Sequence, residues 1–109
     1  YNVLLSKYSH QEDIVIGVPV DGRKQPDLFS VVGMFVNSLP LRNYPKGNKQ
    51  FDEFLNEVKE KNIKMYGNSD YPFEKLVEQL DINRDPSRMP LFDVMINYLT
   101  LENELMDNL

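Results

Sequence analysis

The stretch Val32–Arg42 reads Val-Gly-Met-Phe-Val-Asn-Ser-Leu-Pro-Leu-Arg, and the interpretation of the chain starts from it. From residue 34 to residue 44, one set of side chains that includes Phe35 and Asn37 alternates with a second set that includes Ser38 and Pro40. A repeat of two residues predicts an extended segment. Because proline cannot donate a ladder hydrogen bond, Pro40 places part of this segment at a sheet edge or a bulge.

A second extended segment precedes it, at residues 13–20. Its β-branched side chains are apolar on both faces, which predicts a central strand and not an edge strand. Pro19 is expected to mark the end of this strand, and Asp21-Gly22 is a turn signal. The connector that follows is expected to hold one helical turn around Leu28-Phe29.

Helices are predicted in three places. Residues 1–8 have the spacing of the last turns of a helix. Residues 51–66 carry the clearest amphipathic pattern, and Gly67-Asn68 should end that helix. A further helix should begin at Pro72, because proline is favoured at the first helical position. The last helix is expected to bury Phe73, Leu76, Val77 and Leu80. The apolar stripe of the long helix consists of Phe51, Phe54, Leu55, Val58, Met65 and Tyr66.

Residues 81–90 read as a polar loop that contains proline, and residues 92–99 alternate as a third strand would. The predicted fold class is therefore α+β, with about three strands and two to three helices.

Composition limits the possible functions. The chain has 109 residues, a formal charge of -5, a single histidine and no cysteine. Disulfides and thiolate metal sites are excluded, no metal site is expected, and the net acidity argues against nucleic acid as a partner. The sequence holds no apolar run of about 18 residues, so we expect neither a membrane span nor a membrane partner, and a cytoplasmic location. Because Tyr1 leads directly into an apolar segment, we expect an excised piece of a longer protein.

Local patterns predict no catalytic centre. Gly17–Lys24 has glycines at the spacing of a phosphate-binding loop, but Arg23 and Lys24 stand where lysine and then serine or threonine are needed. His10 is expected to be solvated, since no serine has the glycine neighbours of a nucleophile elbow. For the cluster at residues 84–88 two interpretations remain open: a functional loop, or a turn whose arginines and aspartate pair with each other and with backbone carbonyls.

Three ordered motifs resemble the last three core motifs of the condensation domains of nonribosomal peptide synthetases. They are Val32–Arg42, then Asn68–Glu74, then Arg84–Leu91. Departures are small: Ser38, Ser69 and Met89 stand where the family usually has threonine, glutamine and asparagine. The family's His-His-x-x-x-Asp-Gly motif is not in this sequence.

The resemblance implies a fragment, residues 1–109, of the C-terminal lobe of a domain whose fold is similar to chloramphenicol acetyltransferase. The parent would form amide bonds between carrier-bound aminoacyl or peptidyl thioesters. Implied partners are the remainder of the condensation domain and the carrier and adenylation domains. No cofactor would be bound directly, since phosphopantetheine belongs to the carrier.

By the same resemblance no residue of this chain is catalytic, and the fragment alone is expected to be inactive. Gly33, Phe35, Asn37 and Ser38 would line the substrate channel, with the Asn37 amide orienting a substrate group and Gly33 permitting close backbone approach. Arg42 is expected to pair with a carboxylate at the end of its strand. The residues assigned to structural motifs are Arg42, Asp70, Pro72, Phe73, Arg84, Asp85, Ser87 and Arg88.

Two alternatives stay open: a stand-alone module that docks a carrier protein, and a piece of another acyltransferase of the superfamily, such as a heterocyclization domain. Excision would expose apolar surface and strand edges. We therefore expect self-association through residues 92–99 or residues 1–8.

Overall fold

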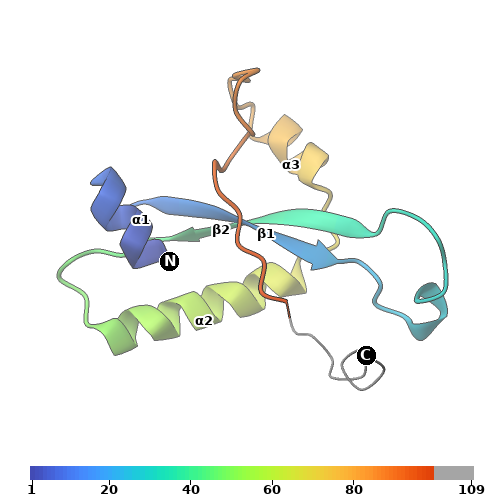
Figure 1. Cartoon of the computed structure of the whole chain (residues 1–109), viewed down its shortest axis with the longest axis horizontal. Coiled ribbons are helices and arrows are strands. Elements are labelled where there is room, and N and C mark those ends of the chain that lie inside the picture. The colour runs from blue at the N-terminus through green and yellow to red at the C-terminus, as the bar shows by residue number, and fades with distance from the viewer. Residues whose placement is uncertain (100–109) are drawn as a thin grey trace, which may run out of the picture.

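A computed structural model describes residues 1–99 (Figure 1). Two strands form a long antiparallel ribbon, and three α-helices lie around it. In chain order the elements are α1 (Asn2–Ser9), β1 (Ile14–Asp21), the 3-10 turn η1 (Pro26–Leu28), β2 (Val36–Asn43), α2 (Phe51–Gly67) and α3 (Phe73–Gln79). The predicted α+β class is confirmed. The middle residues of the predicted third strand, 94–96, lie beside β1 without forming a regular strand.

β1 and β2 pair along their whole lengths, from Ile14 opposite Asn43 to Asp21 opposite Val36. Both strands contain a proline, and Pro40 lies opposite Gly17. The backbone N–H and C=O of Gly17 bond to the other side, to Val94 and Ile96. Gly17 therefore makes no hydrogen bond to β2, and Pro40 opposite it needs no N–H for the pairing of the two strands. Pro19 lies two residues after Gly17, so its backbone nitrogen also points away from β2.

The prediction of a strand at residues 92–99 is wrong except at one point. The Gly17 N–H donates to the Val94 carbonyl at 2.9 Å, and the Ile96 N–H donates to the Gly17 carbonyl at 2.9 Å, which makes a single parallel bridge. In a parallel ladder the next donor toward this segment would be residue 19. Because Pro19 has no N–H, the ladder stops there. Pro19 thus ends this second pairing, whereas β1 itself continues to Asp21 beside β2.

The core lies along the ribbon and beneath the helices. Its buried apolar side chains are Ile14, Ile16, Val18, Val20, Leu39, Leu41, Phe54, Val77 and Phe92. α2 and α3 pack against β2, and α1 packs against β1. Figure 1 shows α2 beside one side of the ribbon, with α3 and the loop after it beside the other. β1 is covered on both faces and lies between β2 and residues 94–96, as its composition predicts for a central strand.

The helix bounds match the predictions to within one or two residues, but burial of the apolar stripes is partial. α2 buries Phe54 and half-buries Val58 and Met65, while Phe51, Leu55 and Tyr66 are exposed. In α3, Val77 is buried, and Phe73 and Leu76 are half-buried. Leu80 is exposed because α3 ends one residue before it, so its predicted burial is wrong.

Candidate functional site

The loop that joins β1 to β2 is held by Arg23. Its Nη1 donates to the carbonyls of Leu28 and Val31, and the guanidinium carbon lies 4.1 Å from the centre of the Phe35 ring. Next to it, the Gly22 N–H donates to the Phe35 carbonyl at 2.9 Å, and a Cβ on Gly22 would stand 2.5 Å from that oxygen. This loop therefore has a defined internal structure built on one arginine and one glycine.

Among the described residues, a close backbone approach is found at Gly22 and not at Gly33. A Cβ built on Gly33 meets only the edge of the Phe35 ring at 3.4 Å, which is near-ordinary contact, and Gly33 is exposed. Within the described residues, position 33 leads into β2 without needing glycine for space, and the close approach implied for Gly33 stays a prediction.

Asn37, in β2, directs its whole side chain at the turn before α3. Its Nδ2 donates to the carbonyls of Ser69 at 3.0 Å and Tyr71 at 2.8 Å. Its Oδ1 accepts from the Phe73 N–H at 3.2 Å. The first two motifs are therefore joined through one side chain.

Asp70 and Phe73 extend this junction. The Asp70 carboxylate pairs with Lys24 Nζ at 2.7 Å, which ties the β1–β2 loop to the same turn. Phe73 packs on Phe92 with ring centroids 5.5 Å apart. Phe92 is 3% exposed and lies where Gly17 has no side chain, since a Cβ there would be 2.3 Å from the ring.

Arg42 pairs with a carboxylate, as the sequence predicts, and the structure identifies that carboxylate as Asp13. The pair is bidentate, with Nε to Oδ1 at 2.9 Å and Nη2 to Oδ2 at 2.6 Å, and both side chains are exposed. The hydrogen bond from Arg42 is the largest cause that holds the pKa of Asp13 below its ordinary value, and the Asp13 partner raises the pKa of Arg42. This pair fastens the outer ends of β1 and β2 to each other.

The loop of the third motif uses its charges locally. Asp85 Oδ1 accepts from the Ser87 N–H at 2.9 Å and from the Ser87 hydroxyl at 2.6 Å, and the side-chain hydrogen bond is the main cause of a lowered pKa of Asp85. Arg88 pairs with Asp93, with Nε to Oδ1 at 2.8 Å, and the hydrogen bond lowers the pKa of Asp93. The expected pairing of the cluster's arginines with Asp85 is thus corrected, because Arg88 reaches forward past the loop to Asp93.

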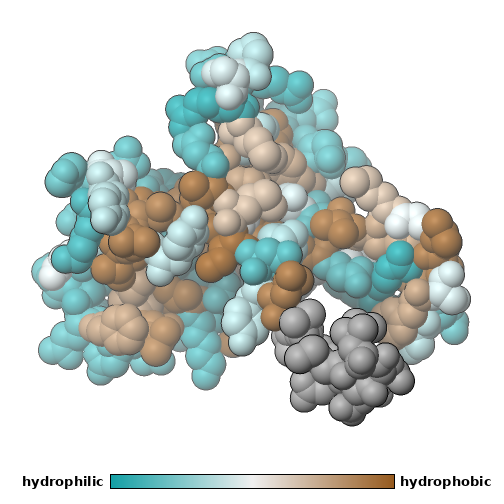
Figure 2. Space-filling view, in the orientation of Figure 1, coloured by the Kyte–Doolittle hydropathy of each residue, from teal (hydrophilic) through white to brown (hydrophobic). Residues whose placement is uncertain are grey.

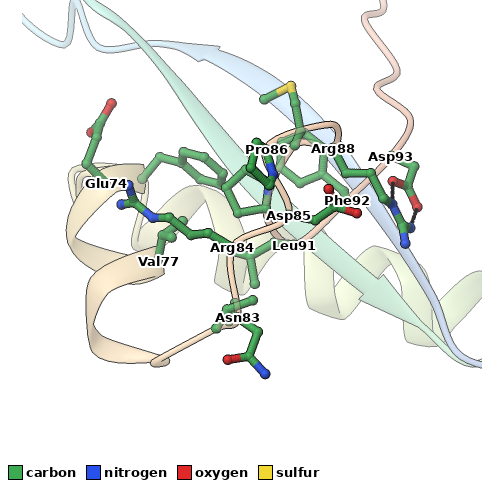
Figure 3. Close-up of a pocket in the computed structure, with 14 residues that line it drawn as sticks. Glu74, Val77, Asn83, Arg84, Asp85, Pro86, Arg88, Leu91, Phe92 and Asp93 are labelled. Carbon is green, nitrogen blue, oxygen red and sulfur yellow. Dashed lines mark hydrogen bonds and ion pairs between the residues drawn. The ribbon is translucent and has the colours of Figure 1, made fainter.

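A cavity of about 680 Å³ separates this loop from α3, and Figure 3 shows residues that line it. Val77 and Phe92 contribute apolar surface, and Arg84 extends across the opening toward Glu74 (Figure 3). Pro72 was predicted to be the first helical residue but stands at the N-cap position, so α3 begins one residue later, at Phe73.

The predicted channel residues do not share one opening. Gly33 and Phe35 line a cavity beside Pro19 and Asn97, whereas Ser38 lines a second one of about 400 Å³ between β2, α2 and Tyr71. Asn37 lines neither of these and belongs to the junction with α3.

The hydrogen bonds of the junction hold backbone segments against each other. His10, the single histidine of the chain, is exposed and closes α1 with a left-handed φ of 55°. Within residues 1–99 no group of three metal-ligating side chains is found.

Two contacts of the junction were not predicted from the sequence: the contact between Gly17 and Phe92, and the ion pair of Lys24 with Asp70. For the first of them, the glycine inside a β-branched strand was the available signal.

Comparison with known proteins gives the family. The family model described as a condensation domain matches residues 1–108. This chain belongs to the condensation-domain family. Tyrocidine synthase 3 of Brevibacillus parabrevis is 57% identical over 104 residues, which is 95% of this chain and 2% of that protein. Surfactin synthase subunit 2 of Bacillus subtilis is 50% identical over 94% of this chain and 3% of that protein. The chain thus spans a few hundredths of the length of these curated relatives.

Solved structures agree with this family. A four-domain nonribosomal peptide synthetase bound to AMP and glycine matches with a TM-score of 0.88 and 28% identity, over 96% of this chain and 8% of that one. The condensation domain of a monacolin K polyketide synthase matches with a TM-score of 0.75 and 27% identity, over 87% of this chain and 23% of that one. In the part of the chain that the structure describes, no helix is both long and apolar enough to cross a bilayer.

Proposed function

We propose that this chain is part of the C-terminal lobe of a condensation domain in a nonribosomal peptide synthetase and supplies scaffold and channel wall. The parent joins two carrier-bound thioesters: the acceptor amine attacks the donor carbonyl, the new C–N bond forms, and the donor thiol leaves with a proton. The observation that carries the proposal is that the family match covers residues 1–108. In support, the first two motifs meet at one junction, which also contacts Phe92 directly after the third motif.

The chemistry of the parent is proposed to lie outside these residues. His10, far from the junction in sequence, serves as the C-cap of α1, and no His-His pair occurs in the chain. A histidine that positions or deprotonates the acceptor amine would come from the preceding part of the same domain. Phosphopantetheine arms on the carrier proteins would deliver both thioesters, and we propose that this chain itself binds no cofactor.

The channel wall is proposed to include Gly33, Phe35, Asn37 and Ser38. Gly33 and Phe35 line one cavity beside the ribbon, and the guanidinium of Arg23 stacks on the Phe35 ring, which restricts its motion. Ser38 is half-buried in the neighbouring cavity. The internal contacts of the β1–β2 loop and of Asn37 support a wall with a fixed backbone, although Phe35 and Ser38 line different cavities.

The remainder of the condensation domain is the proposed partner of the β1–β2 loop. Val32 is 99% exposed and Met34 is 95% exposed, next to the exposed Phe29 and Val36. Figure 2 shows several hydrophobic residues among polar ones at this end of the molecule. Large apolar side chains exposed close together in sequence favour an interaction site. The solved condensation domain of the monacolin K enzyme is more than four times as long as the matched part, so it contains chain enough to cover the patch.

Substitution of Val32 and Met34 by aspartate tests this partner in the full-length protein. We expect the loss of amide formation between carrier-bound donor and acceptor, because the charged side chains would oppose closure of the two parts of the domain. The matched control is Lys46 and Asn48 in the exposed loop before α2, replaced by aspartate, which should leave activity unchanged. Full activity of the Val32 and Met34 variant would contradict the proposed interface.

Titration of the isolated chain with a phosphopantetheinylated carrier separates this proposal from a stand-alone docking module. A wall fragment should bind the carrier weakly or not at all, whereas micromolar binding would favour the stand-alone docking module.

We also propose a cytoplasmic location, where the substrates of such synthetases are made.

A further inference from the structure

The side chain of Asn37 uses both of its donors and one acceptor site on the turn before α3. A primary amide has two N–H donors and an oxygen with two lone pairs. Both donors are used, on the carbonyls of Ser69 and Tyr71, and the oxygen accepts from the Phe73 N–H. The partners also fix the orientation of the amide, since the flipped group would set its oxygen against two carbonyl oxygens.

α3 needs this contact because it has no cap of its own. Its N-cap residue is Pro72, which has no side-chain acceptor, and no side-chain capping bond is made from within the helix. The Phe73 N–H is one of the amides left without a helical partner at a helix start. Asn37 therefore supplies the capping acceptor from β2, in place of the usual serine or aspartate next to the helix. A helix of 7 residues depends on such tertiary contacts to form.

Fixing Phe73 fixes the rest of the junction. The Phe73 ring packs on Phe92, and Phe92 fills the place left open by Gly17. Through these contacts the first motif is connected to the second, and the second to the residue that directly follows the third. The ion pair between Lys24 and Asp70 ties the β1–β2 loop to the same turn at the surface.

We propose that Asn37 is a positioning residue: it clamps the turn before α3 onto β2 and sets the path of the channel wall without contacting substrate. The effect of this clamp on the reaction rests on the proposed function. The clamp itself, which is the set of hydrogen bonds from Asn37 to the turn before α3, depends only on the fold. A role in donating a hydrogen bond to substrate would require breaking a bond to Ser69 or Tyr71.

Two substitutions in the full-length protein separate clamp from substrate contact. Asn37→Ala removes all three hydrogen bonds, and Asn37→Asp keeps an acceptor for Phe73 but sets a carboxylate against two carbonyl oxygens. Amide hydrogen exchange at Phe73 should be about tenfold faster in Asn37→Ala, a change that matches the net free energy of one hydrogen bond. Ser38→Ala, at the next residue of β2, is the control and should leave exchange at Phe73 unchanged.

The Asp variant carries a pH signature that a simple loss of packing lacks. A carboxylate facing two carbonyls has a raised pKa, and its protonated form donates to one of them. The deficit in unfolding temperature against the wild type should therefore be full at neutral pH and shrink as the pH falls through that raised pKa. The packed elements also carry charges, among them Asp70 paired with Lys24, and Glu74 in the first turn of α3. Asp70 and Glu74 would raise the pKa of the new carboxylate further and Lys24 would lower it, so the pH profile reports their sum together with the effect of the two carbonyls.

Kinetics complete the test. In the clamp account Asn37→Ala lowers kcat for amide formation more than it raises KM, and protection of Phe73 falls in parallel. Unchanged exchange at Phe73 in both Asn37 variants would overturn the clamp, whatever the activity. An inactive wild-type protein would instead contradict the proposed function and leave the exchange result standing.

Discussion

At the scale of single residues, Gly17 is the position where β1 admits the C-terminal part of the described chain. Its backbone carries both hydrogen bonds to residues 94–96, and its missing side chain makes room for the Phe92 ring. The sequence shows a glycine in a β-branched strand, which indicates a close approach, but the approaching residue is 75 positions away and only the fold identifies it.

Gly17→Ala should destabilise the protein. The added Cβ would lie 2.3 Å from Phe92 Cε2, and this ring is 3% exposed and packs on Phe73, so it has little freedom to move. Overpacking of this kind costs about 1–3 kcal/mol. Urea unfolding measures it, with Gly47→Ala as the matched control, since nothing lies within 4 Å of a Cβ there. Equal stability of the two variants would count against the contact.

The Asp13–Arg42 pair predicts a pH effect. The hydrogen bond from Arg42 lowers the pKa of Asp13 in the folded state below its unfolded value near 3.8. The pair therefore stabilises the fold above about pH 4, and the effect is lost as the pH falls through the folded pKa. Asp13→Asn should unfold at a lower temperature than the wild type at pH 7, and the gap should close below pH 4. A gap that stays constant across that range would refute this assignment.

At the scale of elements, the periodic patterns predicted the two strands and the helices well, and the pairing partners poorly. Residues 92–99 alternate as a strand does, yet pair with β1 only at Gly17, because Pro19 removes the next donor. The alternation of apolar and polar residues shows which face of a segment is apolar. It does not show whether the neighbouring strand has a backbone N–H to donate to that segment. Asn37 likewise stands out by its motif, but its partners lie 32 to 36 residues further on and give it a capping role that spacing does not reveal.

Pro19→Ala tests why the third segment stays irregular. The new N–H would face the segment after Met95, where the Ile96 carbonyl is the next acceptor of a parallel ladder. We expect slow hydrogen exchange at the amide of residue 19 and slower exchange at the residues that follow Ile96. Exchange at residue 19 as fast as in an unfolded peptide would show that another cause stops the ladder.

At the scale of the whole molecule, the described residues form a ribbon with helices on two sides and with many apolar side chains left exposed. Val32, Met34 and Tyr98 are 99%, 95% and 90% exposed, which is more apolar exposure than the surface of a monomeric soluble protein normally carries. The charge of -5 and the absence of cysteine describe the class of chain, but only the exposed patches indicate where a partner would bind.

Self-association of the isolated chain is the prediction that belongs here. Tyr98 and Leu99 are exposed beside the single bridge to β1, and Leu4 and Tyr8 are exposed on α1. We expect light scattering to give a mass above that of one chain at high concentration. Replacement of Tyr98 and Leu99 by glutamate should lower it. A monomer at every concentration would show that these surfaces do not drive association.

Amide formation is the most direct test of the central claim, that this chain is the wall of a condensation site whose reacting groups lie elsewhere in the same protein. Donor and acceptor amino acids are loaded on their carriers, and the dipeptide on the acceptor carrier is measured by intact-protein mass spectrometry. The full-length protein should form the dipeptide, and the 109-residue chain alone should give no more than a reaction without protein. Dipeptide formed above that background by the chain alone would contradict the account.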